Sequence, residues 1–353
     1  MRYYIHIPFC ASKCRYCHFA SFAGKSSLKE KYLISLKKEI LAFLESDSKI
    51  DKDPDSIYFG WWTPSLLTAE EINSILDTFR WFNGFKNSEI TLEANPQNID
   101  IIYLESLIDA GINRLSIWIQ SLNPKTLSEI WRCDKDSIVN ALKIIQDSRL
   151  ENIWADFIIG LPFALKWQVE SDISEVLDIC PKIKHLSIYM LEEWDYPETW
   201  KDKWLFDHEY VNEYENVFKL LESRWFKRYE LSNWCIPWFE CNHNMAYWSH
   251  KEYVWFGLWA SSFIRGKRKT NASDFKNYFW NKLAFEENLS KGELELEKMM
   301  FEIRTIWLDS GRVRNKDFIS ELEKEGFIKK DGERIVLNPS GVMIADFILG
   351  KLI

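Results

Sequence analysis

Short runs of apolar residues alternate along the chain with longer segments that carry an apolar residue at every third or fourth position. The short runs are typical of buried strands, and the longer segments are typical of helices that bury one face. The expected strands are Arg2 to Ile7, Ser56 to Phe59, Glu89 to Glu93, Arg114 to Ile119, Ile153 to Ile159 and His185 to Leu191. The expected helices are Ser27 to Glu45, Ala69 to Phe82, Ile101 to Ala110, Pro124 to Glu129, Asp136 to Ser148 and Gln168 to Ile179.

This alternation predicts an α/β fold with a parallel sheet and crossover helices. Six units over about 200 residues indicate a partial (β/α)6 barrel, in which functional side chains lie where strands end. After about Phe285 the sequence becomes rich in Glu and Lys, and the pair Asp331-Gly332 between two apolar runs predicts a hairpin. We therefore expect a domain of residues 1–285 and a small α+β accessory domain of residues 286–353 at the C-terminus.

Composition and charge narrow the class of protein. The 353 residues are 46% apolar, enough for a full core, and carry a formal net charge of -8. Phosphate neutralisation needs clustered Lys and Arg, so we expect no nucleic-acid partner. No apolar run reaches the roughly 18 residues of a membrane span, and no signal peptide follows Met1. We expect a cytoplasmic protein with no transmembrane segment, and the sequence leaves peripheral membrane contact and oligomeric state open.

Three of the seven cysteines stand close together directly after the first expected strand. Cys10, Cys14 and Cys17 form the pattern C-x3-C-x2-C, with Tyr16 before the last of them. Three thiolates on one short loop can hold three irons of a cubane 4Fe-4S cluster and leave the fourth iron open to another ligand. A zinc site without its fourth ligand, or a group of buried structural cysteines, would use the same residues. The spacing and the position after the first strand favour the cluster.

This motif resembles that of the radical S-adenosylmethionine (SAM) superfamily. The resemblance implies a radical SAM barrel in which the open iron binds SAM and an electron from the cluster cleaves it. The segment Gly60-Trp61-Trp62-Thr63-Pro64 stands where the branch that includes oxygen-independent coproporphyrinogen III oxidase has G-G-G-T-P. Glycine lets the backbone approach SAM closely, so two indoles are expected to block the site.

The resemblance to this branch continues in "TLEANP", "NRLSIWIQS", "EIWRCDKDS" and "ADFIIGLP". It implies that SAM is bound by Glu93, Gln120, Arg132 and Asp156, with Tyr4 and Tyr16 beside them and with the segment from Gly60 to Thr63. Carboxylates accept hydrogen bonds from hydroxyl or ammonium groups, and a guanidinium pairs with a carboxylate. Each residue alone would more often be a surface or capping residue, but their shared position at strand ends favours a SAM site. The other cysteines, interpreted as packing residues, are Cys133, Cys180, Cys235 and Cys241.

Two differences favour the oxidase-like HemW-type haem chaperones over the oxidases themselves. The oxidases carry a further cysteine where this chain has Phe19, and a long extension where only nine residues precede Cys10. The stretch His243-Asn244-Met245-Ala246-Tyr247-Trp248 matches the H-N-x-x-Y-W motif associated with haem binding in that group. Imidazole is a good axial ligand for haem iron, and aromatic rings pack on porphyrins. His250 is a second candidate ligand, whereas an isolated histidine would more often make structural hydrogen bonds.

Tryptophan is unusually frequent, with 18 Trp against 13 Gly in a chain where Gly should be among the commonest residues. It stands where this branch usually has glycine at Trp61, Trp62, Trp118, Trp131, Trp194, Trp225, Trp238, Trp255 and Trp259. Each exchange should cost several kcal/mol through overpacking, against a total stability of about 5 to 15 kcal/mol. We hypothesise that the gene uses UGA as a glycine codon and that these codons are written as tryptophan. The alternative is an inactivated relative, and Trp248, which belongs to the motif, should be genuine in either case.

The favoured function is that of a haem chaperone that binds haem, a 4Fe-4S cluster and SAM and transfers haem to acceptor proteins. The alternative is an enzyme, an oxygen-independent coproporphyrinogen III oxidase that acts by radical SAM oxidative decarboxylation. The missing cysteine and extension argue against oxidase activity, and catalytic turnover is left open. A third interpretation is a binding protein with a defunct SAM site, which the codons at Trp61 and Trp62 would test.

Overall fold

A curved sheet forms the centre of the molecule in the computed structural model, which describes residues 1–17, 26–46, 49–82, 85, 87–191, 200, 207–305, 307–313 and 315–352. Two positions named above, Phe19 and Trp194, lie outside these residues. The parallel strands of the sheet follow the order of the chain: β1 (Arg2–Ile7), β2 (Ser56–Trp61), β3 (Glu89–Ala94), β4 (Arg114–Gln120), β5 (Ile153–Ile159) and β6 (Ile183–Met190).

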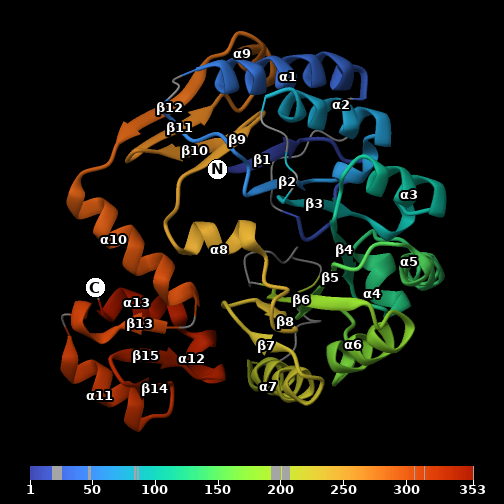
Figure 1. The fold of residues 1–353 in the computed structure, drawn as a ribbon. Helices are drawn as coiled ribbons and strands as arrows, with labels where there is room; N and C mark the ends of the chain where they lie inside the picture. Colours follow the sequence, from blue (N-terminus) through green and yellow to red (C-terminus); the bar gives the residue numbers. More distant parts are fainter. Residues whose placement is uncertain are drawn as a thin grey trace.

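Helices cover the outer face of this sheet (Figure 1). They are α1 (Lys29–Glu45), α2 (Ala69–Arg80), α3 (Ile101–Asp109), α4 (Pro124–Glu129), α5 (Lys135–Asp147), α6 (Gln168–Ile179) and α7 (Asp207–Ser223). The six expected strands and six expected helices are confirmed to within two residues at each end. The partial (β/α) barrel expected from the hydrophobic pattern is confirmed as well.

Local sequence explains where these elements begin. The Thr68 hydroxyl accepts a hydrogen bond from the Glu71 amide, and the Glu71 carboxylate accepts one from the Thr68 amide, which makes a capping box at α2. Asp100 and Asp134 cap α3 and α5, because their carboxylates accept hydrogen bonds from the amides of Tyr103 and Ser137. Strand β5 is buried along its whole length, because helices cover one face and the barrel interior covers the other.

Segments that the sequence analysis did not assign extend the sheet at both edges. Beyond β1 lie β9 (Tyr253–Phe256), β10 (Ser261–Ile264), β11 (Lys267–Asn271) and β12 (Leu283–Asn288), with α9 (Phe275–Phe279) before the last. Beyond β6 lie β8 (Asn233–Cys235) and β7 (Lys227–Arg228). Helix α8 (Asn242–Trp248) lies on the inner side of the curved sheet (Figure 1).

The C-terminal unit packs below α8 in Figure 1. It consists of α10 (Lys291–Glu302), an antiparallel sheet of β13 (Trp307–Asp309), β15 (Arg334–Leu337) and β14 (Ile328–Asp331), and the helices α11 (Lys316–Lys324), α12 (Pro339–Met343) and α13 (Ala345–Leu352). The expected hairpin is confirmed, since Asp331 pairs with Arg334 around Gly332. The expected boundary at residue 285 is wrong: β12 runs to Asn288 and pairs with β11 of the large sheet, so this unit begins after β12.

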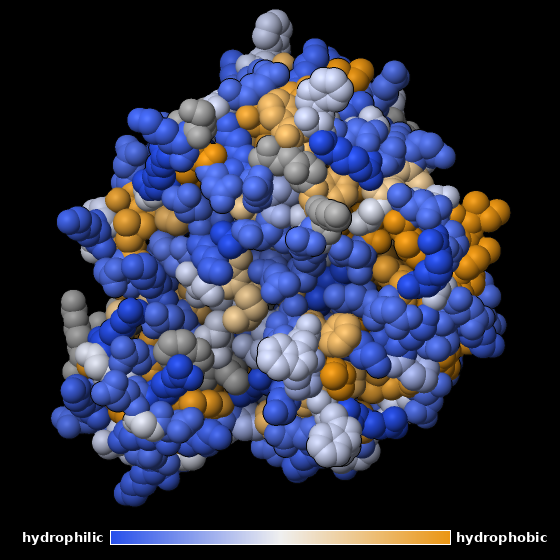
Figure 2. Space-filling view, viewed as in Figure 1, coloured by the Kyte–Doolittle hydropathy of each residue, from blue (hydrophilic) through white to orange (hydrophobic). Residues whose placement is uncertain are grey.

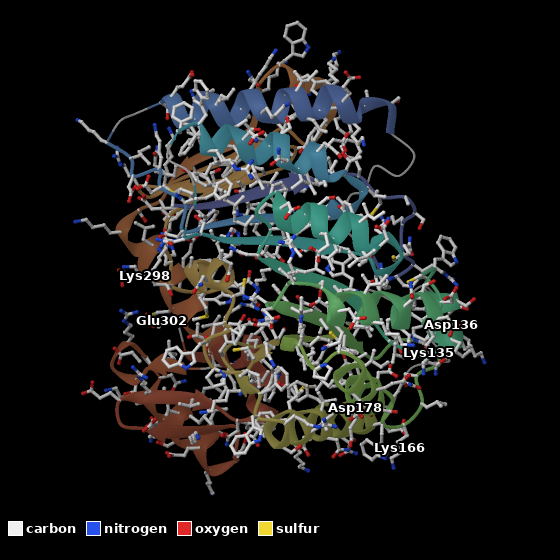
Figure 3. All side chains as sticks on the ribbon, turned by 45° about the vertical axis from the view of Figure 1, so that its right-hand side comes forward. Lys135, Asp136, Lys166, Asp178, Lys298 and Glu302 are labelled. Atoms are coloured by element: carbon white, nitrogen blue, oxygen red, sulfur yellow. The ribbon has the colours of Figure 1, made fainter. Side chains whose placement is uncertain are left out.

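The surface is mainly hydrophilic. Figure 2 shows polar residues over most of one face, with a hydrophobic patch over α3, where Ile102 is 77% exposed. Figure 3 shows Lys135, Asp136 and Asp178 on the outer helical layer. Among the described residues, no helix is both long enough and apolar enough to cross a membrane.

Candidate functional site

A pocket of about 360 Å³ opens where the parallel strands end. Its walls come from the loop after β1, from the segment after β2, and from the carboxyl-terminal ends of β3 to β6. Volumes of roughly 300 to 1,000 Å³ are typical of small-molecule sites. The pocket thus has the position that the barrel pattern predicts for a functional site.

The three clustered cysteines all line this pocket. Each is half-buried, and Cys10 Sγ lies 3.1 Å from Thr63 Oγ1, across from the segment after β2. A hydrogen bond of 3.1 Å from the Cys17 amide to the Cys14 carbonyl gives the loop a tight turn. Burial raises the pKa of the Cys10 thiol above its ordinary value. Within the described ranges, no three His, Cys, Asp or Glu side chains meet closely enough to hold one metal ion.

Two carboxyl groups line the same pocket as the cysteines: Glu93 is half-buried and Asp156 is buried. Glu93 accepts hydrogen bonds from the Tyr58 hydroxyl (2.7 Å) and the Trp61 amide (2.9 Å), and burial raises its pKa to about 8. Asp156 accepts one from the Ser116 hydroxyl (3.1 Å), and burial raises its pKa to about 7. Both pKa values fall when a cation binds nearby, because the cation favours the charged carboxylate.

The other expected SAM residues also lie in this pocket or border it. Arg132 and Gln120 line it, and the Arg132 guanidinium donates to the Asn95 side chain and the Trp118 carbonyl. Gly60 lies behind the wall, where a Cβ would come within 2.7 Å of the Tyr4 hydroxyl. A larger residue at that position would displace the rings of Tyr4 and Tyr58. The lining further includes Tyr4, Tyr16, Thr63, Glu93 and Asp156.

The residues present fit both expected groups. Three thiols on one short loop suit an iron-sulfur cluster. Gln120 Oε1 and Asp156 Oδ1 are buried, and neither has a hydrogen-bond partner among the described residues. Buried polar atoms are nearly always paired, so these two acceptors suit the hydroxyl and ammonium donors of SAM.

Trp61 and Trp62 line the pocket beside the cluster loop, as expected from their position after β2. The Trp61 ring lies 5.1 Å from the His6 ring and 6.4 Å from the Trp255 ring, measured between centroids. Trp62 is 2% exposed. The cavity nonetheless remains open next to them, so the expectation that two indoles block the site completely is wrong: they narrow it.

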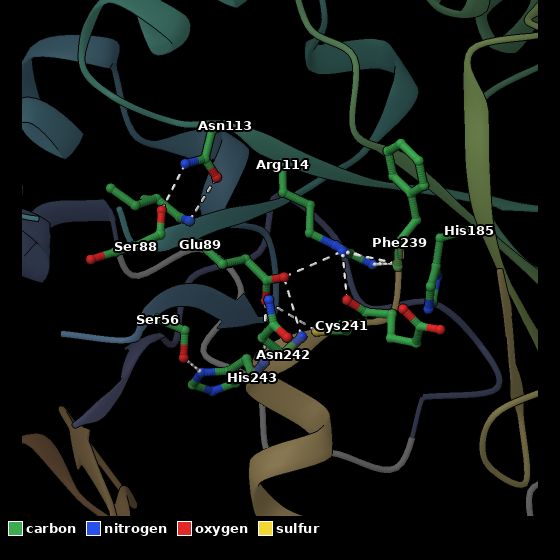
Figure 4. A network of polar contacts seen from close by, with 12 residues as sticks. Ser56, Ser88, Glu89, Asn113, Arg114, His185, Phe239, Cys241, Asn242 and His243 are labelled. Carbon is green, nitrogen blue, oxygen red and sulfur yellow. Dashed lines mark hydrogen bonds and ion pairs between the residues drawn. The ribbon is translucent and has the colours of Figure 1, made fainter. Parts of the chain in front are cut away.

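The expected haem motif lies at the opposite ends of the strands. His243, on α8, is 1% exposed and uses both ring nitrogens: Nδ1 is 2.8 Å from Ser56 Oγ, and Nε2 is 2.6 Å from the Tyr247 hydroxyl. Its amide donates to Glu89 Oε1 (3.2 Å), and Glu89 pairs with the buried Arg114 (Figure 4). Burial lowers the pKa of His243 to about 3, so its ring is neutral. These contacts agree with the alternative given above, in which the histidine makes structural hydrogen bonds and does not bind haem iron.

The remaining motif residues surround this histidine. Tyr247 is half-buried and its hydroxyl also accepts a hydrogen bond of 2.7 Å from Trp255 Nε1. Asn244 and Trp248 are half-buried, and the Trp248 ring lies 5.9 Å from Phe301 on α10. The second candidate ligand, His250, contacts Glu297 through Nε2 at 3.2 Å.

Sequence reasoning missed several residues of the pocket. Tyr58 holds Glu93 in place, and Ser116 holds Asp156. Side chains alternate between the two faces of a strand, and both residues occupy positions that face inward. The alternation along β2 and β4 could therefore have identified them. Other lining residues that were not predicted are Ala11, Ser12, Asn95, Gln97, Trp154, Ile158 and Tyr189. The packing role expected of the scattered cysteines agrees with the burial of Cys180, Cys235 and Cys241, whereas Cys133 is half-buried.

Comparison with known proteins places these features in context. A family model described as the Radical SAM superfamily matches residues 4–176, which contain the cysteine loop and the residues expected to bind SAM. The chain is 31% identical to "Heme chaperone HemW" of Haemophilus influenzae over 86% of this chain and 82% of that protein. It is 28% identical to "Heme chaperone HemW" of Lactococcus lactis over 99% of this chain and 96% of that protein.

Among solved structures, the fold is similar to that of coproporphyrinogen III oxidase (HemN) from Escherichia coli, a radical SAM enzyme. The TM-score is 0.83 at 18% sequence identity, covering 99% of this chain and 89% of that one. This similarity includes the C-terminal unit as well as the half-barrel. At this level of identity it concerns the fold alone.

Proposed function

The chain belongs to the radical SAM superfamily and, within it, to the family of HemW heme chaperones, and we propose from this that it binds haem, a 4Fe-4S cluster and SAM and transfers haem to acceptor proteins. The observation that carries the cofactor part is the convergence of the three cysteines with Glu93 and Asp156 on one pocket. Family membership supports the haem part.

Within this proposal, Cys10, Cys14 and Cys17 hold the cluster, which supplies an open iron for SAM and an electron. Arg132, which donates to the Asn95 side chain and the Trp118 carbonyl, would bind the carboxylate of SAM, because a guanidinium pairs with a carboxylate. Glu93 and Asp156 accept from its ammonium group and ribose hydroxyls. Gly60 keeps the wall of the pocket thin, since a Cβ there would meet Tyr4.

The haem contact we propose lies inside the half-barrel, next to the motif on α8. Tyr4 and Tyr58 line the cofactor pocket and also pack near His243, with ring centroids 6.1 and 5.0 Å away. The Trp255 ring stacks on Tyr4 at 4.4 Å and separates this space from Tyr247. With glycine at position 255, as hypothesised above, Tyr247 would be open to the interior. Ligation by His243 would additionally require that its ring release Ser56 or Tyr247.

The oxidase alternative has no specific support from the site. The similarity to HemN is a similarity of fold, at 18% identity. The position of the additional cysteine, Phe19, lies outside the described residues. We place the protein in the cytoplasm, with haem and haem-accepting proteins as partners.

A haem-transfer assay tests this function. The purified protein is loaded with haem, separated from free haem and mixed with a haem-free acceptor protein of distinct Soret absorption. We expect the acceptor spectrum to appear faster than from haem bound to serum albumin, which is the control for passive release. Transfer no faster than from albumin would contradict a chaperone function.

A further inference from the structure

Six tryptophans occupy left-handed backbone, with φ between 61° and 98°. They are Trp61, Trp131, Trp167, Trp225, Trp238 and Trp259. The other non-glycine residues with positive φ in the described chain are Gln120, Phe163, His250, Arg265 and Asn281, so tryptophan makes up six of these eleven. A bulky side chain in this region is a genuine outlier, because its Cβ crowds the neighbouring carbonyl oxygen. Tryptophan is thus concentrated in the backbone conformation that suits glycine best.

Two of these tryptophans end helices in a geometry that glycine normally provides. After α4, the amide of Arg132 donates to the Leu127 carbonyl (2.9 Å) and that of Trp131 to the Ser128 carbonyl (3.3 Å). After α7, the amides of Phe226 and Trp225 make the same two bonds to Leu221 and Glu222. This is the Schellman motif, whose left-handed residue is usually glycine.

The same chain supplies the direct comparison. Gly111 follows α3 with φ of 106°, and the amides of Gly111 and Ile112 bond to the carbonyls of Ile108 and Leu107 in the same pattern. Gly326 follows α11 with φ of 81°, and Gly326 and Phe327 repeat the pattern. Two equivalent helix ends therefore have glycine and two have tryptophan. Helices α8 and α9 end in the same pattern at His250 and Asn281, whose φ values are 51° and 52°.

Three of the six have largely exposed side chains, which contribute little packing, whereas Trp61 packs against His6 and Trp255. Trp238 is 93% exposed, Trp225 is 82% exposed and Trp131 is 61% exposed. Trp234 differs in both respects: it is 1% exposed in β8, its backbone is not left-handed, and its ring lies 4.7 Å from the Phe218 ring. Backbone conformation thus separates Trp234 from the six left-handed tryptophans, whereas exposure alone does not, since Trp81 (85% exposed) and Trp280 (74% exposed) have negative φ.

We propose that the natural polypeptide has glycine at positions 61, 131, 167, 225, 238 and 259, encoded by UGA codons, and tryptophan at position 234. The family pattern did not indicate glycine at position 167. The assignment of glycine there depends only on the φ of 63°. UGA differs from the glycine codon GGA by one base, and a code that reads UGA as tryptophan writes each one as Trp. The inference rests on backbone geometry and is independent of the haem proposal.

Peptide mass spectrometry of the protein from its source organism tests this directly. We expect glycine masses at the six left-handed positions, Trp167 included, and a tryptophan mass at Trp234 as the internal control. Tryptophan masses at the six positions would overturn the proposal. Glycine at Trp234 as well would overturn the separation of the tryptophans by backbone conformation.

Two matched variants of the recombinant protein provide a second test. Trp225→Gly removes the backbone strain of a left-handed residue and loses little packing, because the side chain is exposed. We therefore expect Tm to rise by roughly 2 °C or more. Trp234→Gly lies nearby but empties a packed site, so we expect Tm to fall. A fall in Tm for Trp225→Gly that equals the fall for Trp234→Gly would contradict the argument from backbone conformation.

A separate contact points to a positioning residue for the cluster loop. Arg15, between Cys14 and Tyr16, pairs with the Glu129 carboxylate at the end of α4. The Arg15 amide also donates to the Ile130 carbonyl at 3.4 Å. Arg132, expected to bind SAM, follows two residues later. One short segment thus contacts both the cluster loop and the SAM site.

We infer that Glu129 positions the cluster loop through Arg15. This rests on the proposed cluster site, so its test measures cluster retention and folding separately. Glu129→Ala should lose iron to a chelator several-fold faster than the parent, and its Tm should also fall, because the buried Trp200 Nε1 donates to the same carboxylate at 2.8 Å. Glu105→Ala, which removes an exposed pair with Arg149, is the matched control and should retain iron like the parent.

Exchanging both charges, in the double variant Arg15→Glu with Glu129→Arg, should restore slow iron loss. Parental iron loss in Glu129→Ala, or a double variant no better than the single one, would overturn the positioning role. If no protein, including the parent, takes up a cluster, the proposed cofactor site itself fails.

Discussion

Ser56 Oγ and His243 Nδ1 are joined by a hydrogen bond of 2.8 Å at the amino-terminal end of β2. Trp61, at the carboxyl-terminal end of the same strand, lines the cofactor pocket. The histidine motif and the expected cluster therefore lie at opposite ends of one strand, inside the same half-barrel. A mutation at one end should leave the other end intact. Mutations can therefore test the histidine motif and the expected cluster site independently.

Cys14→Ala should abolish the cluster. The parent should hold about four irons per chain after anaerobic reconstitution, because three thiolates are the set that holds a cubane with an open iron. Iron and sulfide analysis measures the loss, and Cys133→Ser, half-buried but outside the motif, is the control. Retention of a full cluster in Cys14→Ala would exclude the assignment.

Glu93→Gln should change how stability depends on pH. Burial raises the pKa of Glu93 to about 8 from an ordinary value of 4.5. The folded protein therefore binds more protons than the unfolded chain between these values, and the contribution of Glu93 to stability falls as pH rises through this window. Glutamine resembles the protonated form and cannot ionise, so the variant should gain Tm relative to the parent from about pH 5 to about pH 8. A difference in Tm that stays constant over this range would contradict a raised pKa.

His243→Ala should destabilise the protein by about 1 to 3 kcal/mol, because Ser56 and Tyr247 lose a buried hydrogen-bond partner. Denaturant unfolding measures this free energy. Cluster content should remain that of the parent, since the motif and the cysteine loop are at opposite ends of β2. Loss of iron in this variant without loss of stability would show that the two ends are coupled.

Trp255→Gly should strengthen haem binding. The indole packs on Tyr4 and donates to Tyr247, so its removal opens the interior next to the motif. Haem titration followed at the Soret band measures affinity, and Trp234→Gly, which empties a different site, is the control. Unchanged affinity in Trp255→Gly would place the haem contact elsewhere.

The periodic part of the fold was predictable, because β1 to β6 and the helices between them carry apolar residues at the spacing of buried strands and amphipathic helices. The later strands were not, since segments such as Lys227–Arg228 and Asn233–Cys235 are too short to show a period. The boundary at residue 285 was misplaced because the polar, exposed sequence of β12 resembles a linker, although main-chain pairing with β11 holds it in the sheet.

Much of the lining of the pocket was predictable, because the expected residues lie next to motifs with fixed spacing. The placement of His243 was not, because its burial depends on Ser56 and Glu89, which are distant in sequence. Left-handed backbone at Trp167 likewise depends on the loop before α6, and the family pattern did not indicate it.

Haem binding by the purified, cluster-loaded protein, measured together with its activity on coproporphyrinogen III, tests the central claim most directly. A haem chaperone should bind haem with a saturable shift of the Soret band and leave coproporphyrinogen III unchanged in the presence of SAM and a reductant. A protein that binds no haem, or that decarboxylates coproporphyrinogen III under these conditions, would contradict the account.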